Sequence, residues 1–169
     1  MRTLEAIFKR RSIRKFINKS ISAEDISTLL KAAMMAPTAR NCQEWEFVVI
    51  KKRETLEKIM QVHPHAQMLS TADCAILVCA DTNREYMAGY WTADCGAATQ
   101  NILLAATELG IGSVWLGVYP NEERMKAISE VAQLPSHVFP LNVIALGYPD
   151  ESKEEVERFD PKKVHFEKW

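Results

Sequence analysis

Apolar residues at helical spacing predict the first helices of this chain. Five of them recur every 3.6 residues and define one face of the clearest helix: Ile26, Leu29, Leu30, Ala33 and Met34. Ser22, followed three residues later by Asp25, resembles a capping box at the start of this helix, and Pro37 stops it. A short helix is also predicted to begin behind Thr3 and to run into residues 9–11.

Runs of β-branched, aromatic and other apolar residues predict four strands. They are Trp45–Ile50, Cys74–Ala80, Ser113–Val118 and Val138–Leu146. Because Cys74–Ala80 is apolar without a break, we expect it to be a central strand covered on both faces. The alanine-rich segment Thr92–Leu109 is almost free of charge and predicts a helix surrounded by protein, with Gly110 as its stop. Two more helices are predicted, one over residues 54–62 and one capped by Asn121.

Helices and strands alternate along most of the chain, which indicates one layered domain of helices and sheet over residues 1–169. With 169 residues, 47% of them hydrophobic, the chain can build a real core. No apolar run reaches the roughly 20 residues that a membrane span needs, and the start lacks the apolar segment of a secretory signal. We therefore expect a cytoplasmic protein without a membrane partner. A mitochondrial transit peptide, which the basic and amphipathic start resembles, is the less favoured alternative.

The last twenty residues, 150–169, differ from the rest of the chain. They are highly charged, yet five apolar residues recur among them: Val156, Phe159, Val164, Phe166 and Trp169. This is too much apolar surface for a purely solvated tail. We expect the extension to pack on its own subunit or on a partner subunit, with a disordered tail as the alternative.

The overall charge gives no reason to expect a nucleic-acid partner. The chain carries 21 basic and 22 acidic residues, a formal net charge of -1. Charge is concentrated locally in KRRSIRKF, residues 9–16, and four residues of this stretch form a candidate phosphate site: Arg10, Arg11, Ser12 and Arg14. Guanidinium groups bind phosphate oxygens in a bidentate manner, and a serine hydroxyl adds a donor. A solvated basic surface is the alternative.

APTARNCQEW, residues 36–45, lies between a predicted helix and a predicted strand. It places Thr38, Asn41 and Gln43 close together along the chain. Amide side chains both donate and accept hydrogen bonds, so they suit a ligand with carbonyl and N–H edges, such as a nucleobase or a flavin ring. The same residues are equally suited to bonding their own backbone in a turn.

GIGSVWLGVYP, residues 110–120, has glycines on both sides of a predicted strand. Gly117 would let the backbone approach a flat ligand closely. Gly110 and Gly112 are explained by the end of the preceding helix.

Other kinds of site find no support in the sequence. Rossmann and P-loop nucleotide sites are excluded because there is no GxGxxG after a strand and no GxxxxGK[ST]. His63 and His65 lack a partner at ligand spacing, which argues against a metal site. The cysteines form no CxxC pair and indicate buried free thiols. Without a GxSxG elbow we assign no catalytic side chain.

The order of these features resembles the FMN-dependent nitroreductase family, specifically its short members. The matching segments are RRSIRKF after the first helix, APTARNCQEWEFVVI, DCGAATQNILLAATELGIGSVWLGV, and LGYP at residues 146–149. The ending RFDPKKVHFEKW is similar as well. The resemblance covers most of the chain from residue 10 onward.

The resemblance implies an α+β fold, a mixed sheet flanked by helices, in an intertwined homodimer. Each of two sites would hold one FMN and be built from both subunits, with residues 150–169 packing on the partner subunit. The implied activity is that of an FMN-dependent oxidoreductase that takes hydride from NAD(P)H and reduces nitroaromatics, quinones or similar acceptors in two alternating steps. The alternatives are a non-catalytic flavin-binding or sensor protein, or a specialised flavin enzyme such as a reductive dehalogenase.

By the same resemblance, several residues match cofactor-binding positions of the family. The phosphate, the ribityl chain and the ring edge would be held by Arg10, Arg11, Ser12 and Arg14. The segment that would reach the flavin of the other subunit contains Pro37, Thr38, Asn41 and Gln43. The backbone of Leu116 and Gly117 would face the N5 and O4 region of the ring. Arg158 would lie near the phosphate, with Lys162 and Lys163 as nearby candidates. The chain has little room for the helical insertion that covers the flavin in longer relatives, so we expect a pocket that is either more open or covered by residues 86–91.

Overall fold

The computed structural model describes residues 3–169 as a mixed arrangement of helices and strands, and Met1 and Arg2 lie outside it. The α-helices are α1 (Thr3–Lys9), α2 (Ala23–Ala33), α3 (Arg53–Val62), α4 (Trp91–Glu108) and α5 (Glu122–Ala132). The strands are β1 (Phe16–Ile17), β2 (Trp45–Ile50), β3 (Cys74–Asp81), β4 (Gly112–Gly117) and β5 (Val138–Pro149). Short 3-10 turns are η1 (Ala39–Asn41), η2 (Gln67–Ser70) and η3 (Pro161–Lys163). The expected α+β class is confirmed.

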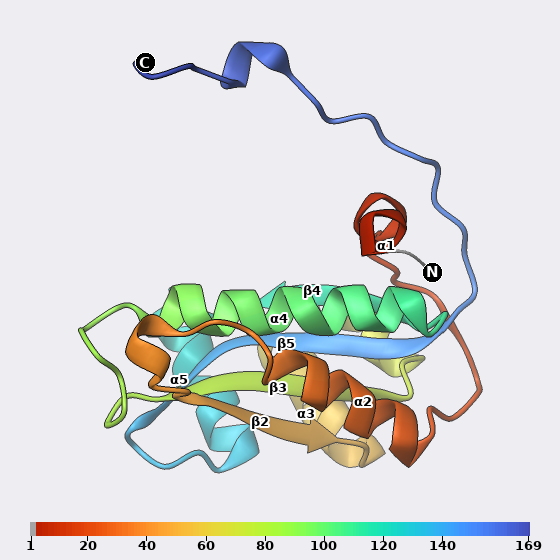
Figure 1. The fold of residues 1–169 in the computed structure, drawn as a ribbon. Helices are drawn as coiled ribbons and strands as arrows, with labels where there is room; N and C mark the ends of the chain where they lie inside the picture. Colours follow the sequence, from red (N-terminus) through yellow and green to blue (C-terminus); the bar gives the residue numbers. More distant parts are fainter. Residues whose placement is uncertain (1–2) are drawn as a thin grey trace.

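The sheet is organised around β5. This strand pairs with β3, β4 and β1, and β2 pairs with β3, so that the path through the sheet is β1-β5-β3-β2 with β4 also on β5. All of these strand pairs are antiparallel. Parallel pairing is confined, within residues 3–169, to one bridge between Ser12 and Ser113. Figure 1 shows the sheet running between the helices.

The sheet separates two hydrophobic cores, and β3 contributes to both. The even-numbered residues from Cys74 to Ala80 pack with α2 and α4, and the odd-numbered residues from Ala75 to Cys79 pack with α3 and α5. Every residue from Cys74 to Ala80 is buried, which confirms the prediction of a central strand covered on both faces. On each face the two helices contact one another, α2 with α4 and α3 with α5.

The helix ends expected from the sequence are present. The hydroxyl of Ser22 accepts a hydrogen bond from the N–H of Asp25 at 2.9 Å, and the side chain of Asn121 caps α5 in the same way. Gly110 follows α4 with a φ of 69°. The N–H of the next residue bonds to the carbonyl of Ala106 at 2.8 Å, which closes a Schellman motif.

Several details differ from the expectation. Helix α1 itself agrees with the expectation, since it ends at Lys9, where the chain turns to run beside β4. Strand β5 continues to Pro149, where it pairs with β1, a strand too short to show any periodicity in the sequence. Met34 is exposed rather than buried, since α2 ends at Ala33. Helix α4 is not surrounded by its own chain, because Gln100 lies on an exposed flank.

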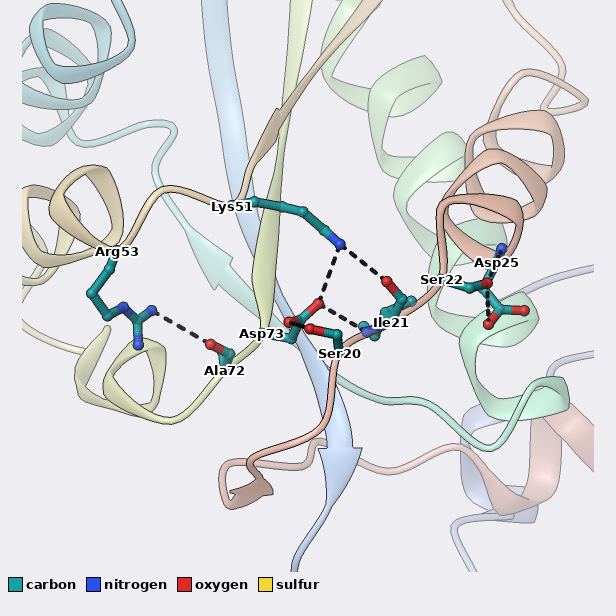
Figure 2. Close-up of polar contacts among 8 residues, drawn as sticks. All are labelled: Ser20, Ile21, Ser22, Asp25, Lys51, Arg53, Ala72 and Asp73. Atoms are coloured by element: carbon teal, nitrogen blue, oxygen red, sulfur yellow. Dashed lines mark hydrogen bonds and ion pairs between the residues drawn. The ribbon is translucent and has the colours of Figure 1, made fainter.

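One carboxylate ties the segment before α2 to the neighbouring connections. Asp73 accepts hydrogen bonds from the hydroxyl of Ser20 at 3.1 Å and from the N–H of Ile21 at 3.0 Å. Lys51 donates to the carbonyl of Ile21 at 3.0 Å and forms an ion pair with Asp73 at 3.6 Å (Figure 2). Arg53 donates to backbone carbonyls of the turn before β3. These contacts fix the ends of β2 and β3 against the start of α2.

Residues 150–169 leave the folded body as an extended segment (Figure 1). One short turn, η3, interrupts it. Its apolar side chains are exposed, those of Val156, Phe159, Val164, Phe166 and Trp169. The extension therefore does not pack these side chains on its own subunit, and packing on a partner subunit stays a prediction.

Candidate functional site

Residues 10–14 run along the edge of β4. The N–H of Ile13 bonds to the carbonyl of Ser113 at 3.0 Å, and Ser12 forms the parallel bridge with the same residue. Ile13 is buried over Gly112, where a Cβ atom would lie 2.8 Å from the Cγ2 atom of Ile13. Because Gly112 has no side chain, the arginine segment can lie this close to the strand.

The three arginines of this segment have different surroundings. Arg11 donates to three backbone carbonyls at 2.7 to 3.0 Å, two at the end of α1 and one at Glu154, so its guanidinium ties α1 to the tail. Arg14 has an exposed side chain, and its N–H donates to the carboxylate of Glu151 at 2.6 Å. Arg10 is partly buried, and no acidic side chain between residues 3 and 169 forms an ion pair with it.

Arg10 lines a cavity of about 1090 Å³ between α1, α4 and the tail. Gln100 of α4 and Arg158 of the tail line the same cavity. Burial lowers the pKa of Arg10, and the positive charges of Arg158 and Arg11 lower it further. Partly desolvated cations that repel one another gain most from a bound anion. The cavity is therefore the strongest candidate for a phosphate site.

Not every residue predicted for the phosphate lines this cavity. Ser12 and Arg14 follow the lining along the chain but are not part of it. Of the three tail cations considered, Arg158 is brought to the cavity, and Lys162 and Lys163 are not. The lining also contains three acidic residues, fewer than its four cations, so a small positive excess is left: Glu5, Glu155 and Glu157 against Lys9, Arg10, Arg11 and Arg158.

Residues 38–43 form a tight loop after α2 that bonds to itself. The hydroxyl of Thr38 accepts the N–H of Gln43 at 3.1 Å, and the amide of Gln43 donates to the side-chain oxygen of Asn41 at 2.9 Å. Arg40, Asn41 and Gln43 all have φ between 50° and 57°, a left-handed conformation that is uncommon outside glycine. In the single chain these residues therefore bond to their own loop, the alternative considered from the sequence. Three residues of this loop have strained backbone, which is typical of functional loops.

This loop is tied to the start of α4. The N–H of Ala39 donates to the carboxylate of Asp94 at 2.8 Å, in the first turn of the helix. Gln100, which lines the cavity, lies farther along α4, and no residue of the loop lines that cavity. In Figure 1 the loop lies at the left end of α4, and α1 lies above its right end. One chain by itself does not bring the two predicted groups of residues together.

Gly117, at the end of β4, presents an open backbone edge. The N–H of Val118 bonds to the carbonyl of Leu141 at 3.0 Å. In an antiparallel pair successive residues point their N–H and C=O alternately toward the partner strand and away from it, so the N–H and C=O of Gly117 point away from β5. A Cβ atom at Gly117 would meet no heavy atom within 4 Å. Leu116, by contrast, is buried in the core. The close approach of a flat ligand, predicted from the sequence, has room at Gly117.

Two side chains hold the carbonyl of Gly117. Nε2 of His63 lies 2.9 Å from this oxygen, and Arg124 donates to it at 2.8 Å. The N–H of His65 donates to Nδ1 of His63 at 3.2 Å, so the proton of the neutral ring is on Nε2. Burial lowers the pKa of His63 more than its bond to Gly117 raises it. His63 is therefore a neutral hydrogen-bond donor that fixes the backbone of Gly117.

Nothing in the sequence connects His63 and Arg124 with Gly117, because His63 is 54 residues away and Arg124 lies in the following helix. From the sequence, His63 and His65 are considered only as metal ligands, and that role is rejected. Within residues 3–169 no group of three His, Cys, Asp or Glu side chains is placed to hold a metal ion. In the same part of the chain, no helix is both long and apolar enough to cross a membrane.

The cysteines are structural. Cys74, Cys79 and Cys95 are buried free thiols, as the sequence predicted. Burial raises the pKa of Cys74 and Cys79 to about 12. These thiols stay protonated and unreactive at neutral pH.

A second cavity, of about 430 Å³, lies beside β1 and the start of α3. Three cations line it: Lys19, Lys51 and Arg53. Lys19 lies 3.9 Å from the centre of the Tyr148 ring, and Lys51 and Arg53 make the contacts of Figure 2. Since each cation already has a partner, this cavity is not a candidate anion site.

The neutral state of His63 predicts a loss of stability in acid. Its pKa is lowered in the folded protein, so the unfolded chain takes up the proton first as the pH falls below about 6.5. The free energy of unfolding should then fall by up to about 1.4 kcal/mol per pH unit, the limit for one proton. Urea unfolding at pH 7.5 and 5.5 measures this loss, which should be smaller in His63→Gln. His165→Gln, in the exposed tail, is the control, and an equal loss in all three proteins would contradict the assignment.

Comparison with known proteins identifies the family of the chain. The model described as Nitroreductase family matches residues 7–71 and 60–148. A protein of Archaeoglobus fulgidus, provisionally named NADH dehydrogenase/NAD(P)H nitroreductase, is 51% identical over 98% of each chain. A crystal structure of a protein with the same provisional name from Bacteroides thetaiotaomicron is 41% identical, with a TM-score of 0.95 over 99% of this chain and 98% of that one. An FMN-dependent nitroreductase of Clostridium difficile R20291 is 32% identical, with a TM-score of 0.91 over 98% and 99%. The chain therefore belongs to the nitroreductase family.

Proposed function

We propose that this chain is an FMN-dependent oxidoreductase that takes hydride from NAD(P)H and passes it to a nitroaromatic, a quinone or a similar acceptor. Membership of the nitroreductase family supports the reaction class, and the Clostridium difficile and Archaeoglobus fulgidus relatives support FMN and NAD(P)H. The observation that carries the proposal is Arg10, which is partly buried, forms no ion pair with any residue between 3 and 169, and shares a cavity with Arg158. A partly buried cation beside a second, exposed one favours a bound anion, and the phosphate of FMN would supply it.

The residues present fit FMN at both of its ends. Arg10 and Arg158 would bind the phosphate, with Ser12 and Arg14 beside them along the β4 edge. The N–H of Gly117 would face the ring, and a Cβ atom at this position would meet no heavy atom within 4 Å. Arg11 is already engaged with three carbonyls, so we assign it to holding α1 and the tail in place.

When bound, FMN supplies the two-electron chemistry that links NAD(P)H to the acceptor in two alternating steps. The protein binds and orients the reactants. The N–H of Gly117 is a fixed donor, and His63 and Arg124 hold the backbone of this residue from its carbonyl side. A preorganised donor costs no reorganisation when charge develops beside it. We assign no side chain as a general acid or base.

A homodimer would complete the site. The segment with Pro37, Thr38, Asn41 and Gln43 reaches no cavity that contains Arg10 in its own chain, so we assign it to the flavin of the partner subunit. The surface available for the contact includes the exposed apolar side chains of the tail and of α1, the latter being Leu4, Ile7 and Phe8. The tail would then lie across the partner, as the resemblance implies. The cytoplasmic location expected from the sequence stays a prediction.

The visible spectrum of the purified protein tests the function directly. We expect a flavin spectrum, with FMN released on denaturation, that bleaches when NADPH or NADH is added under nitrogen. A nitroaromatic or a quinone should then restore the colour. A protein that binds no FMN would contradict the cofactor assignment. A bound flavin that never bleaches would instead favour a flavin-binding protein without turnover.

The phosphate site predicts the effect of removing Arg10 and Ser12 together. The double variant Arg10→Ala with Ser12→Ala should weaken FMN binding by roughly 10- to 100-fold, because a charge-assisted hydrogen bond contributes about 1.5–3 kcal/mol. Thermal unfolding of the apoprotein should hardly change, since neither side chain lies in the core. Titration of the apoprotein with FMN, followed by fluorescence, gives the dissociation constants. Lys15→Ala is the matched control from the same basic stretch, and unaltered affinity in the double variant would refute the phosphate assignment.

The tail predicts the effect of two further substitutions on assembly. Phe159→Ser with Phe166→Ser should raise the dimer dissociation constant more than about 100-fold, because burial of each phenylalanine contributes about 1.5–3 kcal/mol. Sedimentation equilibrium measures the change. Lys162→Ser, between them in the tail, should leave the dimer intact. A wild-type protein that sediments as a monomer, or a double variant as dimeric as wild type, would contradict the role of the tail.

A further inference from the structure

Glu44 has a buried carboxyl group whose oxygens have no hydrogen-bond partner in the described part of the chain. It follows the 38–43 loop and precedes β2, and its side chain is 1% exposed. The N–H of Asp81 donates to its backbone carbonyl at 2.8 Å, so the residue is fixed in place. An ionised carboxylate here would lose its hydration without compensation, which is strongly unfavourable.

Two other carboxyl groups, those of Asp94 and Glu85, raise the pKa of Glu44. Both already accept hydrogen bonds from backbone N–H groups. Asp94, itself 8% exposed, accepts the N–H of Ala39 at 2.8 Å. Glu85 accepts two backbone N–H groups around the start of α4, at 3.1 and 3.3 Å. Backbone N–H donors stabilise a carboxylate in its ionised form. Of the three groups, Glu44 is the one whose side-chain oxygens accept no such bond from another residue between 3 and 169.

The other charged and titratable groups nearby do not neutralise an ionised Glu44. Arg84 is paired with two carboxylates of its own, and Arg40 lies 4.2 Å from the centre of the Tyr86 ring. The Cys95 thiol, from α4, also interacts with Glu44, and burial raises the pKa of this thiol so far that it stays neutral.

We propose that Glu44 is a neutral carboxylic acid in the folded protein, and that its proton, shared toward Asp94, holds the 38–43 loop in its strained shape. The proton removes the like-charge repulsion between the two side chains, so that Asp94 keeps its bond to Ala39. Ionisation of Glu44 would place two neighbouring buried charges beneath a loop that three left-handed residues already strain. For the flavin this rests on the proposed function, because a released loop would no longer present its amide side chains to the partner's site. Glu44 is thus a positioning residue.

The proton on Glu44 sets the direction of the pH dependence. Burial raises the pKa of Glu44 above its ordinary value of 4.5, a backbone hydrogen bond lowers it by less, and Asp94 and Glu85 raise it further. Between 4.5 and the raised pKa, the folded protein holds a proton that the unfolded chain has lost. The free energy of unfolding therefore falls as the pH rises through this window and is constant beyond it. Loop opening depends on the same proton, with a limit of about tenfold per pH unit.

The ionisation of Glu44 can be followed by NMR in protein labelled with ¹³C at the glutamate carboxyl carbon. The resonance that disappears in Glu44→Gln belongs to this residue, and we expect it to titrate above 4.5. Asp94→Asn should move the titration to lower pH, because the asparagine oxygen still accepts the N–H of Ala39 but carries no charge. A Glu44 resonance that titrates at or below 4.5 would overturn the proposal.

Hydrogen exchange of the Ala39 N–H reports on the loop without any flavin. After correction for the intrinsic exchange rate, protection should fall by up to about tenfold per pH unit as Glu44 ionises. Glu46→Gln, an exposed glutamate two residues away on β2, should behave as wild type, and Glu44→Gln should show no such fall. Equal profiles in wild type and Glu44→Gln would refute the role of the proton.

Titration of the apoprotein with FMN across the same pH range tests the functional part. The dissociation constant should rise with pH in wild type and in Glu46→Gln, but not in Glu44→Gln. A constant that does not change with pH would contradict the link between Glu44 and the flavin. A protein that binds no FMN at any pH would contradict the proposed function, while NMR and hydrogen exchange would still decide the state of Glu44.

Discussion

The sheet depends on the pairing of β5, which bonds to three of the other four strands. Its register with β4 fixes where Gly112 and Ser113 lie, and these two residues receive Ile13 and the arginine segment. Its register with β3 fixes β2 in turn, and β2 begins where the 38–43 loop ends. Both groups of candidate ligand residues are therefore positioned by the hydrogen bonds of one buried strand, although they lie at different places along α4.

Local signals in the sequence were enough for much of this fold. The cap at Ser22 and the unbroken apolar run at Cys74–Ala80 could be predicted because each depends on residues close together in the sequence. The structure confirms both predictions. Strand β1 could not be predicted from the sequence, because its two residues form a strand only by pairing with the end of β5. The ends of helices were uncertain for a related reason, since the turn after α1 is set by contacts with β4.

The candidate site was predictable in its composition but not in its arrangement. The sequence could single out Arg10 and Thr38 by residue type, yet only the fold shows that one lines a cavity with Arg158 and that the other closes a loop on itself. His63 and Glu44 carried no recognisable signal, because a buried titratable residue acquires its role from partners far away in sequence. Both side chains are uncharged: His63 donates a hydrogen bond to Gly117, and Glu44 is an acid beside Asp94. Neutral polar groups thus support the backbone on which a charged ligand would rest.

The open edge of β4 has a consequence for the isolated chain. The arginine segment covers one end of this edge through Ser12, and His63 and Arg124 hold the carbonyl of Gly117 at the other end. Trp115 lies between these two contacts, and its side chain is exposed. An uncovered strand edge is a template on which another copy can add a strand, which is how β-sheet proteins aggregate. In a newly made chain without ligand or partner, the backbone at Trp115 is consequently open to such pairing, beside the place where a flat ligand would bind. Occupying that edge would protect the protein's solubility in addition to any reaction that takes place there.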